Sequence, residues 1–242
     1  MSAEPFPRGD LADELDLLAT GRVEIVGRIP GSSNATFAVL LTAGPREWFA
    51  VYKPEAGERP LWDFEPGLYK RERAAFLLSE HLGWGLVPPT VVREDAPVGV
   101  GSLQWYIEAD AEHYFTLREG APESESVMRR VALFDYVSNN TDRKSGHVLR
   151  DADGRVWAID HGLCFAAEYK LRTVIWNFAG QPVPGDLLDA VAPLADGVPD
   201  ELAALLSGRE VRALRHRVRR LLEEPLFPAD LTGGYGYPWP LV

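Results

Sequence analysis

The sequence contains a single cysteine, Cys164, among its 242 residues. One cysteine excludes a disulfide within the chain and a zinc site built from cysteines, and it favours a reducing, cytoplasmic environment. No apolar run reaches the about 18 residues that a membrane-spanning helix needs, so we expect no membrane span. The opening residues, MSAEPFPRGD, are polar, and we expect no secretory signal.

Basic residues are fewer than acidic residues in this sequence. There are 25 Lys and Arg against 36 Asp and Glu, which gives a formal net charge of -11. General nucleic-acid binding depends on a basic surface, so this balance argues against a nucleic-acid partner. It does not exclude a small anionic ligand, because a local cluster of cations can oppose the global charge. The length suffices for one large domain or for two lobes around a cleft.

The first part of the chain predicts a short helix followed by an antiparallel meander. Asp10 can cap a helix that ends near Thr20, and Gly21 suits its end. Three strand-like runs follow, separated by turn-forming residues: Val23–Ile29, Thr36–Thr42 and Trp48–Lys53. The first turn reads PGSSNAT and could direct N–H groups and hydroxyls at a phosphate, or it could be an ordinary hairpin turn.

Lys53 and Glu72 are two charged residues within apolar patterns. Lys53 ends a strand before Pro54, and burying an unpaired ammonium is costly. It therefore faces either solvent or a cleft with an acidic partner. A helix is predicted from about Glu65 to Leu82, with Pro66 near its first turn, and Glu72 shares its apolar face. Glu72 is the favoured partner for Lys53, and Glu65 is the rival.

The second part is predicted to be mainly helical. Two extended stretches, 90–94 and 102–107, precede an acidic segment at 108–113, where we place a boundary between a first lobe (1–108) and a second lobe (109–242). Helices are predicted from Ser124 or Ser126 to Ser138, and over 184–194, 200–206 and 208–224. The last helix carries five arginines, which we expect on a solvated face: Arg209, Arg212, Arg215, Arg219 and Arg220. The aromatic tail GGYGYPWPLV is expected to dock onto the protein.

The segment from Asn139 to Asp160 predicts a hairpin with acidic ends. The turn DADG separates two short strand-like runs, 148–150 and 155–159. A hairpin brings its own ends together, so Asp142, His147 and Asp160 should lie near one another on loops. Loops on a rigid scaffold are frequent positions for catalytic groups.

The order of these features resembles the protein-kinase-like superfamily. NNTDRKSGH, which begins at Asn139, resembles the catalytic loop D-R-x-x-x-N, and IDHGLCF, which begins at Ile159, resembles the metal-binding loop D-x-G. The chain is most similar in these motifs to atypical bacterial kinases related to the phosphatidylinositol 3- and 4-kinases and to the HipA-like kinases. The resemblance covers about residues 23–178. It implies an α+β fold with two lobes, the first rich in antiparallel strands and the second mainly helical.

The resemblance also implies roles in phosphoryl transfer from ATP with Mg²⁺ or Mn²⁺. Asp142 would orient or deprotonate an acceptor hydroxyl on a protein or small molecule, and Lys144 would stabilise charge on the transferred group. Asp160 would hold the metal. The residues that would bind the nucleotide are Lys53, oriented by Glu72, and the turn residues Ser32, Ser33 and Asn34.

His147 departs from the family pattern, which has asparagine at this position as a second metal ligand. Imidazole suits softer divalent ions than Mg²⁺. Three interpretations stay open: His147 binds a softer metal, it fills space or bonds a loop carbonyl, or the protein is a degenerate, nucleotide-binding pseudokinase or scaffold. AMP transfer in the same site is a further alternative. A metal hydrolase using Asp142, His147, Asp160 and His161 is another, but it leaves Lys53 and Glu72 unexplained.

Overall fold

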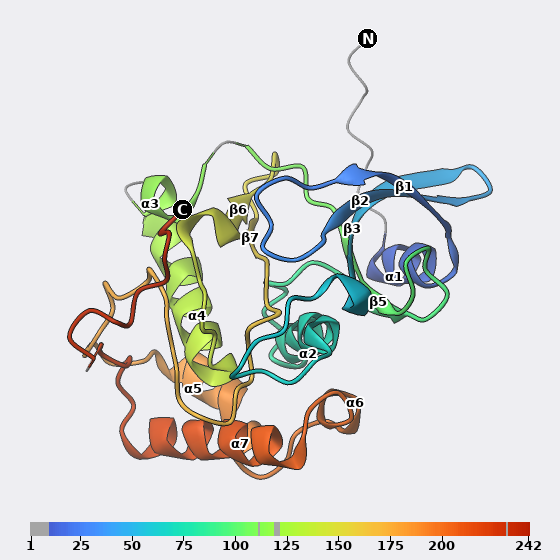
Figure 1. Ribbon diagram of the computed structural model, residues 1–242. Helices are drawn as coiled ribbons and strands as arrows, with labels where there is room; N and C mark the ends of the chain where they lie inside the picture. Colours follow the sequence, from blue (N-terminus) through green and yellow to red (C-terminus); the bar gives the residue numbers. More distant parts are fainter. Residues whose placement is uncertain (1–9, 111, 119–121, 231) are drawn as a thin grey trace. The chain divides into compact units, whose positions relative to one another are not determined.

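The computed structural model describes residues 10–110, 112–118, 122–230 and 232–242. The chain divides into two compact units (Figure 1). The first consists of Met1–Arg59 and Pro89–Tyr106, and the second of Pro60–Pro88 and Ile107–Val242. The division of the sequence into lobes at 108/109 stays a prediction. Within the described residues, no helix has the length and apolar character required to cross a membrane.

The first unit is built on a five-stranded antiparallel sheet with the order β1-β2-β3-β5-β4. The strands are β1 (Arg22–Arg28), β2 (Phe37–Ala43), β3 (Arg46–Pro54), β4 (Thr90–Arg93) and β5 (Gly101–Trp105). The predicted meander is confirmed, with strand ends shifted by one or two residues. A 3-10 turn, η1 (Glu55–Gly57), follows β3.

Helix α1 (Leu11–Thr20) packs against one face of this sheet. As predicted, Asp10 caps it, with its carboxylate accepting from the Ala12 N–H at 3.5 Å. Leu17 and Leu18 belong to one buried apolar cluster with strand residues that include Leu41 of β2, and Ala50 and Tyr52 of β3. Burial of each such apolar side chain contributes about 1.5–3 kcal/mol. Because side chains alternate across a strand, the neighbouring residues Val51 and Lys53 of β3 point to the opposite face.

The second unit is mainly helical and contains a two-stranded hairpin. Its helices are α2 (Leu68–His81), α3 (Tyr114–Leu117), α4 (Pro122–Ser138), α5 (Gly185–Val191), α6 (Asp200–Ala203) and α7 (Gly208–Glu223), with 3-10 turns η2 (Ser145–His147) and η3 (Ala192–Ala195). The hairpin pairs β6 (Val148–Arg150) with β7 (Val156–Ala158). An α+β fold with an antiparallel β-rich first part and a helical second part is thus confirmed.

Two helix starts differ from the predictions. Helix α2 begins at Leu68 and not at Glu65, because Gly67 holds a left-handed backbone with φ of 97° that glycine adopts without strain. Pro66 therefore precedes the helix. Helix α4 begins at Pro122, ahead of the predicted serine caps. The one-turn helix α3 was not predicted, since four residues carry too little periodic pattern.

Helix α7 has a buried apolar stripe that includes Leu214, Val218 and Leu221. Of the five arginines expected on a solvated face, Arg209, Arg212, Arg219 and Arg220 are exposed and Arg215 is half-buried. A sixth arginine of the helix, Arg217, lies on the buried side. Arg217 is 5% exposed, and its Nε donates to the Val137 carbonyl at 3.1 Å at the end of α4. The stripe therefore includes one cation, which desolvation shifts to a lower pKa of about 10.

Candidate functional site

Arg143 is the centre of a buried polar network beneath the loop that carries Asp142. Its side chain is fully buried, and its Nε and Nη2 each donate to the Asp135 carboxylate at 3.0 Å. Its Nη1 donates to the carbonyls of His147 at 3.2 Å and Ile159 at 2.8 Å. Arg143 therefore joins helix α4 to both ends of the hairpin. Such charge-assisted, bidentate bonds fix geometry more tightly than neutral ones.

Asn139 and Asn140 continue this network on the other side of the loop. The Asn140 amide donates to Asp135 at 3.0 Å, and its oxygen accepts the Asp142 N–H at 2.9 Å. Asn139 holds the segment after the motif IDHGLCF: its amide donates to the carbonyls of Ala166 and Glu168, and its oxygen accepts the Lys170 N–H at 3.0 Å. Asn139 adopts φ of 52°, a conformation that asparagine tolerates better than most residues.

Asp142 and Lys144 form an ion pair with a separation of 3.3 Å between Lys144 Nζ and Asp142 Oδ2. The two side chains are 27% and 20% exposed, respectively. Burial raises the pKa of Asp142 above its ordinary value of 3.8, while Lys144 acts in the opposite direction and lowers it. The pair is thus partly desolvated yet accessible, which suits a proton acceptor beside a positive charge.

The hairpin returns the chain from His147 to Asp160. Its strands pair Val148 with Ala158, and the Ile159 N–H donates to the His147 carbonyl at 3.0 Å. The His147 Nε2 lies 3.3 Å from Asp160 Oδ2, so the predicted approach of these two residues is confirmed. Asp160 is half-exposed and adopts φ of 60°, an uncommon conformation that recurs at functional sites.

Glu72 reaches the same loop from helix α2. Its carboxylate accepts the His161 N–H at 3.0 Å, which ties α2 to the residue after Asp160. His161 is fully buried, with its Nε2 2.8 Å from Arg143 Nη2. His161 lies on a loop, and its buried ring completes the network around Arg143. Cys164 is buried, and burial raises the pKa of its thiol.

The donor set near Asp160 fits a cation that shares its coordination with a ligand. Among the described residues, no group of three or more His, Cys, Asp or Glu side chains forms a ready metal cage. Asp160 supplies one accessible carboxylate, with His147 beside it. Mg²⁺ is commonly held by one or two carboxylates together with substrate phosphates, and Mn²⁺ accepts both carboxylate and imidazole ligands.

In the first unit, Lys53 stands opposite Ser102 in the register between β3 and β5. The Ser102 hydroxyl is buried and has no hydrogen-bond partner within the described chain. An orphaned buried hydroxyl beside a lysine fits a polar ligand at this face of the sheet. The pairing of Lys53 with Glu72 or with Glu65 stays a prediction.

The predicted phosphate-binding turn, with Ser32, Ser33 and Asn34, lies between β1 and β2. The Asn34 side chain accepts the Arg59 N–H at 2.9 Å, and the Ala35 N–H donates to the Gly57 carbonyl at 2.9 Å. The turn is therefore anchored to the segment that follows β3. A phosphate-binding role for these residues stays a prediction.

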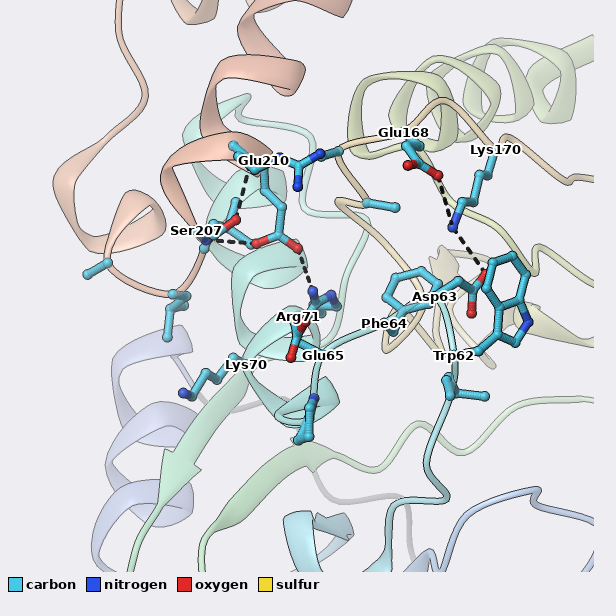
Figure 2. A pocket seen from close by; sticks show the side chains of 18 residues that line it. Trp62, Asp63, Phe64, Glu65, Lys70, Arg71, Glu168, Lys170, Ser207 and Glu210 are labelled. Carbon is cyan, nitrogen blue, oxygen red and sulfur yellow. Dashed lines mark hydrogen bonds and ion pairs between the residues drawn. The ribbon is translucent and has the colours of Figure 1, made fainter.

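A pocket of about 660 Å³ lies in the second unit next to the segment that Asn139 holds. Figure 2 shows Arg71, Glu210 and Ser207 at one end, and Trp62, Asp63, Glu168 and Lys170 at the other. The Lys170 ammonium lies 3.1 Å from Asp63 Oδ2 and 5.4 Å from the centre of the Trp62 ring. Trp62 itself is 93% exposed. An open pocket with both charges and an exposed indole suits a polar ligand.

The sequence did not predict Asp135, Arg143 or Asn139 as positioning residues. Asp135 lies within the apolar stretch LFDYV of a helix, and an acid in such a place calls for a buried partner. Arg143 follows Asp142 in the motif DRKSGH. These two signals together would have suggested the pair, although the folded hairpin was needed to show which carbonyls Arg143 also binds.

The fold is similar to that of several solved kinases. Among solved structures, the chain is similar to the Helicobacter pylori proinflammatory kinase CtkA, with a TM-score of 0.53, 11% identity, and coverage of 87% of this chain and 94% of that chain. The Golgi casein kinase with Mn/ADP bound has a TM-score of 0.53 and 15% identity, with coverage of 96% of this chain and 80% of that chain. Hydra Fam20 with sugar has a TM-score of 0.51 and 14% identity, with coverage of 88% of this chain and 87% of that chain. The narrower resemblance to phosphatidylinositol 3- and 4-kinases and HipA-like kinases is not confirmed by these likenesses.

At the level of sequence, no family model matches the chain. A curated relative is "Protein Rv2133c" of Mycobacterium tuberculosis (strain ATCC 25618 / H37Rv). It is 41% identical over 266 aligned residues, which cover 94% of this chain and 95% of the relative. Identity at this level over nearly the whole of both proteins shows common descent. The chain belongs to the family of the Mycobacterium tuberculosis protein Rv2133c.

Proposed function

We propose that this protein is an ATP-dependent phosphotransferase that uses Mg²⁺ or Mn²⁺. The observation that carries the proposal is the partly desolvated Asp142–Lys144 pair, on a loop that the hairpin connects to Asp160. The kinase-like fold supports it, as does the Golgi casein kinase structure with Mn/ADP bound. The acceptor is a hydroxyl on a protein or a small molecule.

The proposed chemistry is an in-line displacement at the γ-phosphorus. The bond from the acceptor oxygen to phosphorus forms, the bond to the β-phosphate oxygen breaks, and ADP leaves. The Asp142 carboxylate accepts the hydroxyl proton, and the Lys144 ammonium offsets negative charge on the transferred group. Asp142 must be ionised for this role.

Nucleotide binding is proposed for Lys53, Glu72 and the turn before β2. Lys53 would bind the α- and β-phosphates, and the turn residues Ser32, Ser33 and Asn34 would cover them. Glu72 would orient Lys53, in addition to its observed bond to the His161 N–H.

The metal would be held by Asp160, and when bound it would neutralise phosphate charge. His147 has two roles consistent with its contacts. If Nδ1 accepts the Lys144 N–H, as the 3.4 Å separation places it, then Nε2 carries the proton and donates to Asp160. If the ring binds the metal through Nε2, this bond to Lys144 is lost. A His147→Asn variant separates these roles, since a ligand role predicts a shift of metal preference from Mn²⁺ toward Mg²⁺.

ADP formation from ATP tests the proposal without a known acceptor, because water can replace the hydroxyl. We expect metal-dependent turnover by the wild-type protein and a loss of at least about 100-fold in Asp142→Asn. Asp110→Asn is the matched control, because Asp110 lies in an exposed ion pair with Arg150. Equal turnover in wild type and Asp142→Asn would contradict the proposal.

A non-catalytic nucleotide-binding protein is the second candidate, and the observation that favours it is His147 in place of asparagine. It predicts metal-dependent nucleotide binding with no turnover. AMP transfer in the same site would release pyrophosphate in place of ADP and would add the mass of AMP to a protein acceptor. Mass spectrometry after incubation with ATP distinguishes these outcomes.

A further inference from the structure

The aromatic tail, which the proposed chemistry does not use, lies against the catalytic loop. Residues 232–241, here called the strap, are anchored at their start by Asp230, whose carboxylate accepts the N–H groups of Thr232 at 2.8 Å and Gly234 at 3.0 Å. The hydrogen bond from Thr232 and the backbone bonds lower the pKa of Asp230. Hydrogen bonds of the strap with Thr173, Trp176 and Ser145 confirm the prediction that the tail docks onto the protein.

Gly236 is the central contact of the strap. Its carbonyl accepts the Thr173 N–H at 2.9 Å and the Trp176 Nε1–H at 3.1 Å. There is no room for a side chain: a Cβ at this position would lie 2.7 Å from the Asp230 carboxylate and 3.0 Å from the Trp176 ring. The Tyr237 ring adds an edge contact with Trp176, at 6.5 Å between centroids.

The segment around Thr173 connects the strap to the catalytic loop by hydrogen bonds. The residues before and after Thr173 form backbone hydrogen bonds with Arg143. The Arg143 N–H donates to the Arg172 carbonyl at 3.0 Å, and the Val174 N–H donates to the Arg143 carbonyl at 3.1 Å. The Thr173 hydroxyl also donates to Asp135 at 3.3 Å. A continuous series of hydrogen bonds thus runs from the strap through the Thr173 segment to Arg143.

The end of the strap contacts the catalytic loop directly. The Leu241 carbonyl accepts the Ser145 N–H at 2.7 Å. Ser145 is fully buried, and its hydroxyl lies 2.8 Å from His113 Nδ1 and accepts the Phe115 N–H at 3.1 Å. The strap therefore supports the residues on both sides of Lys144. It contacts Ser145 directly and supports Arg143 through the Thr173 segment.

We infer that the strap is a positioning element that holds Asp142 and Lys144 in register for phosphoryl transfer. The carbonyls of Gly236 and Leu241 are its positioning groups. The catalytic part of this inference rests on the proposed function. A displacement of about 1 Å in a reacting group can cost on the order of 100-fold in rate, so a contact this close to Lys144 can control turnover without touching the substrate.

Two variants release the strap at different points. Gly236→Val forces a side chain into the Asp230 carboxylate and the Trp176 ring, and deletion of residues 241–242 removes the carbonyl that Ser145 uses. Trp239→Ala is the matched control in the same segment, because that indole is 87% exposed. Hydrogen exchange of the full-length chain, read over residues 142–147, reports on the loop whether or not the protein transfers phosphate.

We expect exchange over 142–147 to accelerate at least about tenfold in both release variants and to stay unchanged in Trp239→Ala. In turnover assays, kcat should fall by on the order of tenfold while KM for ATP is retained. Unchanged exchange in the deletion variant would overturn the inference even if Gly236→Val misfolds. Faster exchange with unchanged kcat would also overturn it. A wild type without any turnover, but with the expected exchange, would count against the proposed function and leave the structural support intact.

Discussion

In the first unit, Lys53 is held by strand register above an apolar core, whereas in the second unit Asp142 is held by buried side-chain hydrogen bonds. Lys53 lies on a strand whose alternate residues, such as Tyr52, pack against α1. Asp142 lies on a loop that Asn140 and Arg143 tie to Asp135. Regular structure positions a residue through the backbone, while an irregular loop needs dedicated polar partners.

These two ways of holding a residue predict that the two units differ in how much stability they lose on substitution. An apolar core tolerates substitutions that preserve volume, because its interactions are non-directional. A buried ion pair tolerates little, since removal of one partner leaves the other charged and desolvated. The predictions below test this comparison, beginning with the largest expected effect.

Arg143→Ala should lower the free energy of unfolding of the second unit by about 3–5 kcal/mol, because Asp135 would be left buried without its guanidinium partner. Chemical denaturation followed by far-UV circular dichroism measures the loss. A second variant, Asp135→Asn with Arg143→Leu, removes both charges and should restore part of the stability. A loss below about 1 kcal/mol in Arg143→Ala would show that the pair does not anchor the loop.

Leu41→Ala in the first unit should cost about 2–5 kcal/mol, because the side chain is fully buried against α1 and leaves a cavity. Leu41→Met preserves most of the volume and should cost less than about 1.5 kcal/mol. The same denaturation experiment measures both. Equal losses for the two variants would contradict the description of this core as non-directional.

Lys53→Met should weaken ATP binding by about 10- to 100-fold, corresponding to the loss of hydrogen bonds from a charged donor to phosphate. Isothermal titration with ATP and Mn²⁺ measures the dissociation constant. Arg46→Met, on the same strand, is the control, because its guanidinium pairs with Asp16 at the surface. Similar weakening by both variants would mean that general charge, not position, governs binding.

The pH dependence of turnover should report the environment of Asp142. Burial raises the pKa of this carboxylate, and the active form is ionised. The fall of kcat on the acid side of its pH profile should therefore occur above pH 3.8. Lys144→Met removes the charge that lowers this pKa, so the fall should move to still higher pH. A fall that moves to lower pH in Lys144→Met would contradict the assigned direction.

Arg46→Ala should have the smallest effect, less than about 1 kcal/mol on the free energy of unfolding. Arg46 and Asp16 also form an Arg–Asp pair, with 2.7 Å between Nη2 and Oδ2, but their side chains are 42% and 52% exposed. Water compensates for the lost partner at such a site. A loss as large as that of Arg143→Ala would remove the distinction between the two pairs.

Much of the fold could be predicted from sequence, because period-two strands, turn residues and the DADG hairpin are local signals. The pairing of His147 with Asp160 followed from that hairpin alone. The start of α2 was missed, since Gly67 uses a left-handed backbone that no periodicity reveals. The burial of His161 and the reach of Arg143 to two carbonyls depend on tertiary contacts, and the attachment of the strap to Ser145 spans almost one hundred residues of sequence.

The most direct test of the phosphotransferase proposal is a thermal-shift titration with ATP, GTP and ADP, each with Mg²⁺ or Mn²⁺, on the wild type and Asp160→Ala. A ligand that binds only the folded state raises the melting midpoint, by about 5 °C or more at concentrations near 100-fold above Kd. The proposal predicts a metal-dependent ATP shift in the wild type that Asp160→Ala loses. No shift with any nucleotide in the folded wild type, or an equal shift in the variant, would contradict it.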